Sequence, residues 1–271
     1  MKIALLLPGP LRSFSECWNS LSEQLIKPIE QYYDDITFKI FIEYFHVSQE
    51  FYEQEYEKNI FNSKMEIDTP GWQEILKNSR YFEYQNEYIF KDQYIFDIFE
   101  EINKVNNKKY NPLSLKKISK QKKEKCNSFY YNFYVFIQGI CLHFNNKKLI
   151  DKIPPEFQIS IKGRSDTFYE KRYPVEQFSN IEENVVYLQE GERWDCFFVS
   201  HTKTLQKLYS NFFKHCQKFI YILKKKGKLK PEKMLLLLLK YEKIEIKKYT
   251  YNCNNHWKVN RHLINPKYKR D

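Results

Sequence analysis

The apolar positions of the first 45 residues follow the pattern of a parallel α/β unit. Residues 2–7, KIALLL, form an apolar run that ends at Pro-Gly-Pro, which is typical of a buried strand followed by a turn. Residues 15–29 then place their apolar side chains at helical spacing, and residues 36–45 alternate between apolar and polar side chains. A strand, a helix and a second strand in this order predict a βαβ unit and therefore a parallel sheet.

The second half of the chain continues with elements of both kinds. We expect helices over residues 127–147, 202–226 and 231–243, and strands over residues 157–161, 185–188, 194–201 and 243–249. Residues 46–125 mix aromatic and acidic side chains without a clear period, so helices and short strands both remain open there. Because neither a repeat nor a Gly/Ser-rich linker is present, a single domain over residues 1–271 is the simplest organisation.

The composition excludes a disordered chain, since 42% of the residues are hydrophobic and 22 Tyr and 22 Phe are available for a core.

The six cysteines form no C-x-x-C pair and show no zinc-ligand spacing, so we interpret them as free thiols. The run KIALLL is too short for a signal peptide, and we find no stretch of about 20 apolar residues that would span a membrane. The sequence therefore predicts a cytoplasmic protein.

Positive charge is concentrated in the last part of the chain. Residues 201–271 contain 19 Lys and Arg against 4 Asp and Glu, a net of +15, whereas the whole chain carries +11. A basic region on a nearly neutral body predicts an anionic partner, which can be nucleic acid, a phosphorylated ligand or an acidic membrane face. A solvated lysine-rich surface is the alternative interpretation.

Candidate chemistry begins directly after the first predicted strand, at residues 8–14, PGPLRSF. Ligands of open α/β sheets bind beyond the carboxyl ends of the strands, so Pro8, Gly9 and Arg12 are candidates for contact with a nucleotide. The segment has neither G-x-G-x-x-G nor G-K-[ST], which argues against a dinucleotide fingerprint and against a P-loop. A tight turn with a surface arginine is the structural alternative.

The predicted strand over residues 157–161 leads into KGRSD, which places Arg164 and Asp166 where this strand ends. A carboxylate in this position can hold a divalent cation that neutralises a diphosphate, and an arginine can bind a phosphate directly. A structural pair of the two side chains is the alternative.

Three further candidates come later in the chain. Asp195 precedes an apolar run, Glu232 follows the proline that opens a predicted helix, and His256 lies in NNHWKVNR, from which it would reach a phosphate or a metal. The helix macrodipole alone favours a glutamate at the position of Glu232, and a lone histidine is more often a structural residue. No Ser-His-Asp spacing or H-E-x-x-H motif is present.

Four of these segments together resemble bacterial surface-polysaccharide glycosyltransferase-like proteins of the capsule and lipopolysaccharide type. They are KIALLLPGPLRSFSECWNSL, ISIKGRSDTFY, WDCFFVSHTKTLQKLY and PEKMLLLLLKY, and residues 46–125 lie outside the resemblance. The resemblance implies a GT-A-like, Rossmann-type α/β fold with a mixed, mostly parallel sheet flanked by helices. In it, residues 1–125 would be mainly the nucleotide-binding half, and residues 126–271 mainly the metal and acceptor half.

The resemblance also implies roles for the candidate residues. Pro8, Gly9 and Arg12 would hold the nucleotide, Asp166 would hold Mn or Mg on the diphosphate, and Asp195 or Glu232 would act as base or acceptor anchor. The family pattern is Asp-x-Asp, whereas Arg164 takes the first acidic place here, so the resemblance implies that an arginine would replace part of the cation's charge. Arg164 and His256 would contact the phosphates.

We therefore expect a glycosyltransferase that moves a sugar from a nucleotide-sugar donor to a growing surface glycan or a lipid-linked acceptor. The basic region would suit peripheral contact with the anionic inner face of a membrane. Two alternatives remain open: a nucleic-acid-binding protein that uses the basic region, and a GT-A-like protein that binds a nucleotide without turnover. The aromatic residues concentrate outside the basic region, which argues against nucleic acid.

Overall fold

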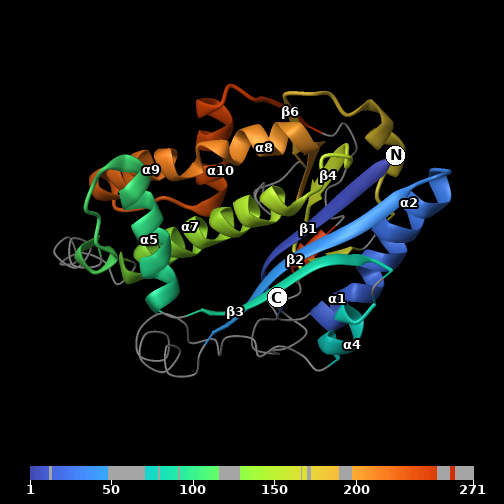
Figure 1. The fold of residues 1–271 in the computed structure, drawn as a ribbon, viewed down its shortest axis with the longest axis horizontal. Helices are drawn as coiled ribbons and strands as arrows, with labels where there is room; N and C mark the ends of the chain where they lie inside the picture. Colours follow the sequence, from blue (N-terminus) through green and yellow to red (C-terminus); the bar gives the residue numbers. More distant parts are fainter. Residues whose placement is uncertain are drawn as a thin grey trace, which may run out of the picture.

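The computed structural model of the chain is a mixed α/β fold in which one large sheet lies between two layers of helices (Figure 1). It describes residues 1–11, 14–47, 71–78, 80–90, 92–115, 129–165, 167–169, 172–188, 197–248 and 257–259. The predicted fold class, an α/β fold with a mixed, mostly parallel sheet flanked by helices, is confirmed.

The large sheet has seven strands in the order β3-β2-β1-β4-β7-β6-β8. Its strands are β1 (Lys2–Pro10), β2 (Thr37–Val47), β3 (Phe82–Phe90), β4 (Ile159–Lys162), β6 (Val185–Leu188), β7 (Phe198–His201) and β8 (Glu245–Lys248). Only β7 runs against its neighbours, since it pairs antiparallel with β4 and β6 while the other pairs of the sheet are parallel. A small second sheet joins β5 (Thr167–Tyr169) to β9 (Trp257–Val259).

One face of the sheet is covered by an almost continuous helical segment of three parts. Its parts are α1 (Phe14–Leu21), the π-helical turn η1 (Ser22–Ile26) and α2 (Lys27–Tyr32), and α4 (Trp72–Leu76) and the 3₁₀ turn η4 (Val175–Asn180) lie on the same side. Alternate residues of β1, Ile3, Leu5 and Leu7, point into this layer and are fully buried. The two-residue period of the strand thus sends every second apolar side chain to this core.

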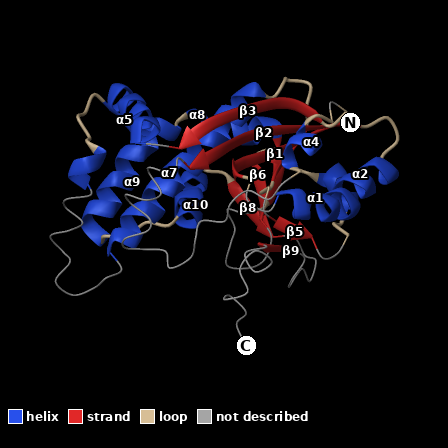
Figure 2. Ribbon diagram, turned by 90° about the horizontal axis from the view of Figure 1, so that it is seen from below, coloured by secondary structure: helices blue, strands red, loops and turns tan. Residues whose placement is uncertain are grey.

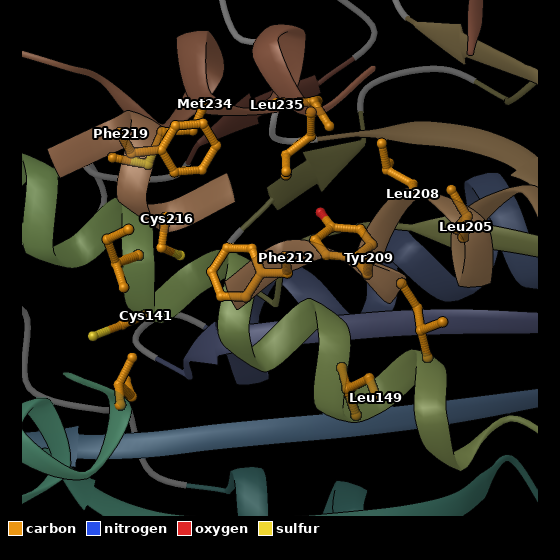
Figure 3. Packing of buried hydrophobic residues seen from close by; sticks show 14 of the residues in the cluster. Cys141, Leu149, Leu205, Leu208, Tyr209, Phe212, Cys216, Phe219, Met234 and Leu235 are labelled. Carbon is orange, nitrogen blue, oxygen red and sulfur yellow. The ribbon is translucent and has the colours of Figure 1, made fainter. Parts of the chain in front are cut away.

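The opposite face is covered by helices that follow β3 in the chain. They are α5 (Asp92–Asn106), α7 (Phe129–Lys152), α8 (Thr202–Ser210), α9 (Phe212–Lys226) and α10 (Pro231–Tyr241). Ala4 and Leu6 of β1 join this core, in which α7 lies against β1 and β2. Figure 3 shows side chains of α7, α8, α9 and α10 meeting between the helices.

The described cysteines, Cys17, Cys141 and Cys216, are free and buried, as predicted. Burial raises the pKa of the Cys141 and Cys216 thiols above the ordinary value. Both thiols therefore stay protonated near neutral pH and pack as small apolar groups.

Several element boundaries differ from the prediction. Residues 202–226 were expected to form one helix, but the chain breaks at Asn211 into α8 and α9, which lets both helices place an apolar face on the same core. The strand predicted over residues 2–7 continues to Pro10, and the helix predicted over residues 127–147 continues to Lys152. Of the described helices, none is long and apolar enough to cross a membrane.

An ion pair lies in the layer between β2 and α7. The Glu43 carboxylate is fully buried, forms an ion pair with the Lys148 ammonium and accepts a hydrogen bond from the Asn86 amide at 3.0 Å. Its other oxygen, Oε2, is buried without a hydrogen-bond partner. A carboxylate in this position depends on its cation, because burying an unpaired charge is costly.

We expect Lys148→Met to lower the free energy of unfolding by about 3 kcal/mol, because Glu43 loses its counter-charge while it stays buried. Lys147→Met is the matched control, since Lys147 pairs with the exposed Asp151 one helical turn away, and it should cost less than about 1 kcal/mol. Urea denaturation of both variants measures the difference. Equal losses would contradict a role for the buried pair.

Candidate functional site

The carboxyl edge of the large sheet gathers the ends of its parallel strands. In Figure 2 the arrowheads of β2 and β3 point to the same end of the molecule, and β1, β4, β6 and β8 run in their direction. The antiparallel β7 begins at this edge, where Phe198 lies opposite both Lys162 and Leu188. This is the edge at which open α/β sheets bind their ligands.

The end of β1 is a strand rather than the predicted turn. Pro8, Gly9 and Pro10 continue the parallel ladder with Glu43, Tyr44 and Phe45 of β2. On the other side of β1, pairing with β4 ends at Leu6, whose carbonyl accepts a hydrogen bond from Gly163 N–H at 2.9 Å. Because every second residue of a strand faces the same neighbour, Pro8 and Pro10 face the side that β4 has left, where their missing N–H groups cost no ladder bond.

Gly9 has an unusual backbone conformation, with φ of 116°. A Cβ built on it would meet no atom within 4 Å, so the backbone angle and not crowding requires glycine. Its register partner, Tyr44, donates a hydrogen bond from its hydroxyl to the Glu87 carboxylate at 3.2 Å. Burial, assisted by the Glu87 charge, raises the pKa of Tyr44 to about 12, so this hydroxyl remains a donor at neutral pH.

The end of β4 is cationic. Lys162, its last residue, is 1% exposed, and the half-buried Arg164 follows two positions later. Gly163 lies between them and fits closely against β1, because a Cβ there would stand 3.3 Å from Leu7 and 3.4 Å from Leu5. A buried ammonium is stable only when anionic or polar groups surround it, so the surroundings of Lys162 must accept positive charge.

Lys162 was missed in the sequence, although its signal was present. The alternation that sends Ile159 and Ile161 to one core sends Ser160 and Lys162 to the other, and all four side chains are buried. A lysine on the buried face of a central strand therefore indicated a candidate site residue. The prediction named Arg164 and Asp166 instead, because they lie beyond the strand.

Glu232 lies in the first turn of α10, which is fixed against α7. His143 of α7 is 1% exposed, and its Nε2 lies 3.1 Å from the Pro231 carbonyl while its Nδ1 lies 3.0 Å from the Tyr209 hydroxyl. Since a carbonyl only accepts, Nε2 carries a proton and donates it to the Pro231 carbonyl. Gly139 allows the close approach, because a Cβ there would come within 2.8 Å of Met234 Sδ.

Some of the predicted site residues belong to the described part of the chain, and others lie outside it. Pro8, Gly9 and Arg164 lie at the carboxyl edge, where the hydrogen bond from Gly163 brings the end of β4 beside β1. Glu232 belongs to the helical layer on the α7 face. The positions that fall outside the described residues are Arg12, Asp166, Asp195 and His256. Among the residues that the structure describes, no group of three His, Cys, Asp or Glu side chains could hold a metal ion.

Comparison with known proteins gives a likeness in structure only. No protein-family model matches the sequence, and no curated protein matches it either. A solved structure that matches is the apo form of mouse xyloside xylosyltransferase 1, with 9% sequence identity and a TM-score of 0.37 over 92% of this chain and 85% of that chain. The resemblance to surface-polysaccharide enzymes therefore stays a prediction.

Gly9→Ala should destabilise the protein by about 1–2 kcal/mol, because a side chain is strained at this φ even though space for a methyl group exists. Thermal and urea unfolding measure the loss. Pro8→Ala is the control at the neighbouring strand position, where φ is not in the glycine region, and it should change the free energy of unfolding by less than about 1 kcal/mol. An unchanged stability of Gly9→Ala would show that the strand end relaxes freely.

Proposed function

We propose that the protein is a glycosyltransferase with a GT-A-like fold that binds a nucleotide-sugar donor at the carboxyl edge of its large sheet. The observation that carries the proposal is that two strand ends lie side by side. The end of β4 is cationic, and the end of β1 has no strand neighbour on the side that faces β4. Lys162 ends β4 and Arg164 follows it, beside the Pro8–Gly9 segment of β1, where β4 no longer pairs with β1. A donor's diphosphate needs positive charge, and its nucleoside needs room beside the strand.

The reaction in this proposal breaks the bond between the sugar's anomeric carbon and the diphosphate oxygen, and the bonding electron pair leaves with the nucleoside diphosphate. Lys162 and Arg164 stabilise the negative charge that develops on this leaving group. The acceptor hydroxyl oxygen forms the new bond to the anomeric carbon, and its proton passes to a carboxylate if the enzyme inverts the configuration. Asp195 and Glu232 are the candidates for this base, and His256 and Arg12 are candidates for donor contacts.

A metal ion would supply further positive charge on the diphosphate, with Asp166 as its predicted ligand. Lys162 and Arg164, the charged side chains described at the end of β4, are basic, and basic side chains are poor ligands for Mn or Mg. We therefore assign the neutralisation of the diphosphate to Lys162 and Arg164. The acceptor is proposed to be a growing surface glycan or a lipid-linked sugar, as the resemblance implies.

Nucleotide binding tests the donor site. We expect UDP, GDP, CMP or dTDP to raise the unfolding midpoint of the protein, because a ligand that binds only the native state stabilises it by mass action. Lys162→Met should raise the dissociation constant of the nucleotide by about tenfold or more, since it removes a charged contact with the diphosphate. The matched control is Lys39→Met, which changes a β2 lysine that contacts Glu83 and the Arg80 carbonyl.

The same assay with EDTA or Mn, on wild type and Asp166→Ala, separates the two sources of positive charge. A shift that survives EDTA supports the assignment to Lys162 and Arg164, whereas a shift that requires both Mn and Asp166 would restore the metal. If no nucleotide shifts the midpoint, the donor site is refuted. Tight nucleotide binding without any loss of sugar from a donor would instead identify a nucleotide-binding protein without turnover.

Release of nucleoside diphosphate from a donor tests the catalytic carboxylate. Asp195→Asn and Glu232→Gln each remove one candidate base. The variant that has lost the true base should have a turnover number about 10²–10⁴-fold lower, because general-base catalysis contributes that much. The nucleotide-induced thermal shift should stay the same in that variant, which distinguishes a base from a binding residue. Wild-type turnover in both variants would rule out both candidates.

A further inference from the structure

One exposed face of α9 is positively charged along its length. Lys214, Lys218, Tyr221 and Lys225 follow one another at spacings of four, three and four residues, which places them on the same side of a helix. All four are exposed, and Tyr221, at 63%, is the most exposed large apolar side chain of the described residues. We call these four residues the α9 basic face.

The positive charge continues beyond the end of the helix. The last residue of α9, the turn into α10 and the first turn of that helix add four further exposed lysines, Lys226, Lys228, Lys230 and Lys233. Glu232 is the only acidic residue between positions 212 and 233. In the part of the chain that the structure describes, the ion pairs involve neither these four lysines nor those of the α9 basic face.

Helix stability does not explain this distribution. Lys224, Lys225 and Lys226 in the last turn of α9 complement the helix dipole, but Lys214 lies in the first turn, where the dipole disfavours a cation. An ordinary solvated face mixes both signs of charge, which lowers its self-repulsion. A face with one sign therefore fits a partner that supplies the opposite charge.

We propose that the α9 basic face and the lysines that follow it bind the surface of an anionic lipid bilayer. Lysines on flexible stems suit the diffuse field of anionic headgroups, in which each strengthens binding by about fivefold. A tyrosine in their middle has the ring and hydroxyl that favour the boundary between headgroups and acyl chains. Residues 201–248 contain no arginine, the residue best suited to bidentate phosphate contacts, so nucleic acid is the less favoured partner.

The position of α9 relates the proposed membrane contact to the candidate functional site. In Figures 1 and 2, α5 and α9 lie toward the end of the molecule to which the arrowheads of β2 and β3 point. Docking through α9 would thus bring the carboxyl edge of the sheet toward the membrane. If the proposed transferase function holds, an acceptor carried on a membrane lipid becomes accessible there, but the docking itself does not depend on that function.

Vesicle sedimentation of the full chain tests the proposal. Vesicles of equal parts phosphatidylcholine and phosphatidylglycerol should bind the protein, more weakly as salt is raised, and pure phosphatidylcholine vesicles should not. Replacing Lys214, Lys218 and Lys225 by Gln should weaken binding by about tenfold or more, and Tyr221→Ser should weaken it severalfold. These exposed substitutions should lower the unfolding midpoint only slightly, through the loss of the contact between the Lys218 ammonium and the Tyr241 ring, which lies 4.0 Å from the ring centroid.

A matched triple variant changes the same net charge elsewhere. Lys27, Lys77 and Lys203 are exposed on α2, at the end of α4 and on α8, and their replacement by Gln should weaken binding by less than about threefold. Equal losses in the two triple variants would overturn the proposal, as would equal binding to neutral vesicles. Salt-sensitive binding to RNA or DNA without vesicle binding would also overturn it. Nucleotide-induced thermal shifts, measured on the same proteins, report separately on the transferase proposal.

Discussion

The pairing of β1 with β4 is the contact on which the rest of this structure depends. It joins two segments that are far apart in the sequence, since Ile3 pairs with Ile159 and Leu6 with Lys162. Strands from both halves of the chain thereby become one sheet with a shared carboxyl edge. Because the pairing stops at Leu6, one side of the last residues of β1 is left without a strand neighbour. The candidate site exists because the ladder ends early there, while β2 continues to support β1 to Pro10.

Buried polar groups near this edge follow a common rule. Glu43 lies between β2 and α7, His143 lies between α7 and the helices α8 and α10, and Lys162 ends β4; each is almost fully buried. Glu43 has Lys148 as its counter-charge, and His143 uses both ring nitrogens for hydrogen bonds. Such groups stabilise a fold only while their partners are in place, so Glu43 fixes α7 against β2 and His143 fixes α10 against α7. The position of Glu232 follows from this arrangement, because His143 contacts the residue directly before it.

Much of the sheet could be predicted from the sequence, because apolar runs and alternation identify strands directly. The strand over residues 185–188 and the helix that Pro231 opens were predicted with the right starts, and residues 245–248 of the predicted strand KIEIKKY form the edge strand β8. The extent of β1 was wrong, since Pro-Gly-Pro normally marks a turn and only the departure of β4 makes two prolines acceptable. The break at Asn211 was also missed, because α8 and α9 are both amphipathic and the pattern shows no interruption. Of the candidate site residues, Pro8, Gly9 and Arg164 were expected at the carboxyl edge of the sheet and lie there, whereas the burial of Lys162 depends on strands that are distant in the sequence.

The order in which the two faces of the sheet are covered has a consequence for synthesis on the ribosome. Helices α1 and α2 directly follow β1 in the chain, so the first face of the β1–β2 pair receives its cover as soon as it forms. The second face, with Leu6 and Phe41, stays uncovered until α7 has been synthesised. The centre of the sheet is incomplete until β4 has been synthesised. A nascent chain that has produced β3 therefore carries an apolar sheet face without its main helix. Such a chain is a natural client for chaperones, and folding is completed only after the second half has left the ribosomal tunnel.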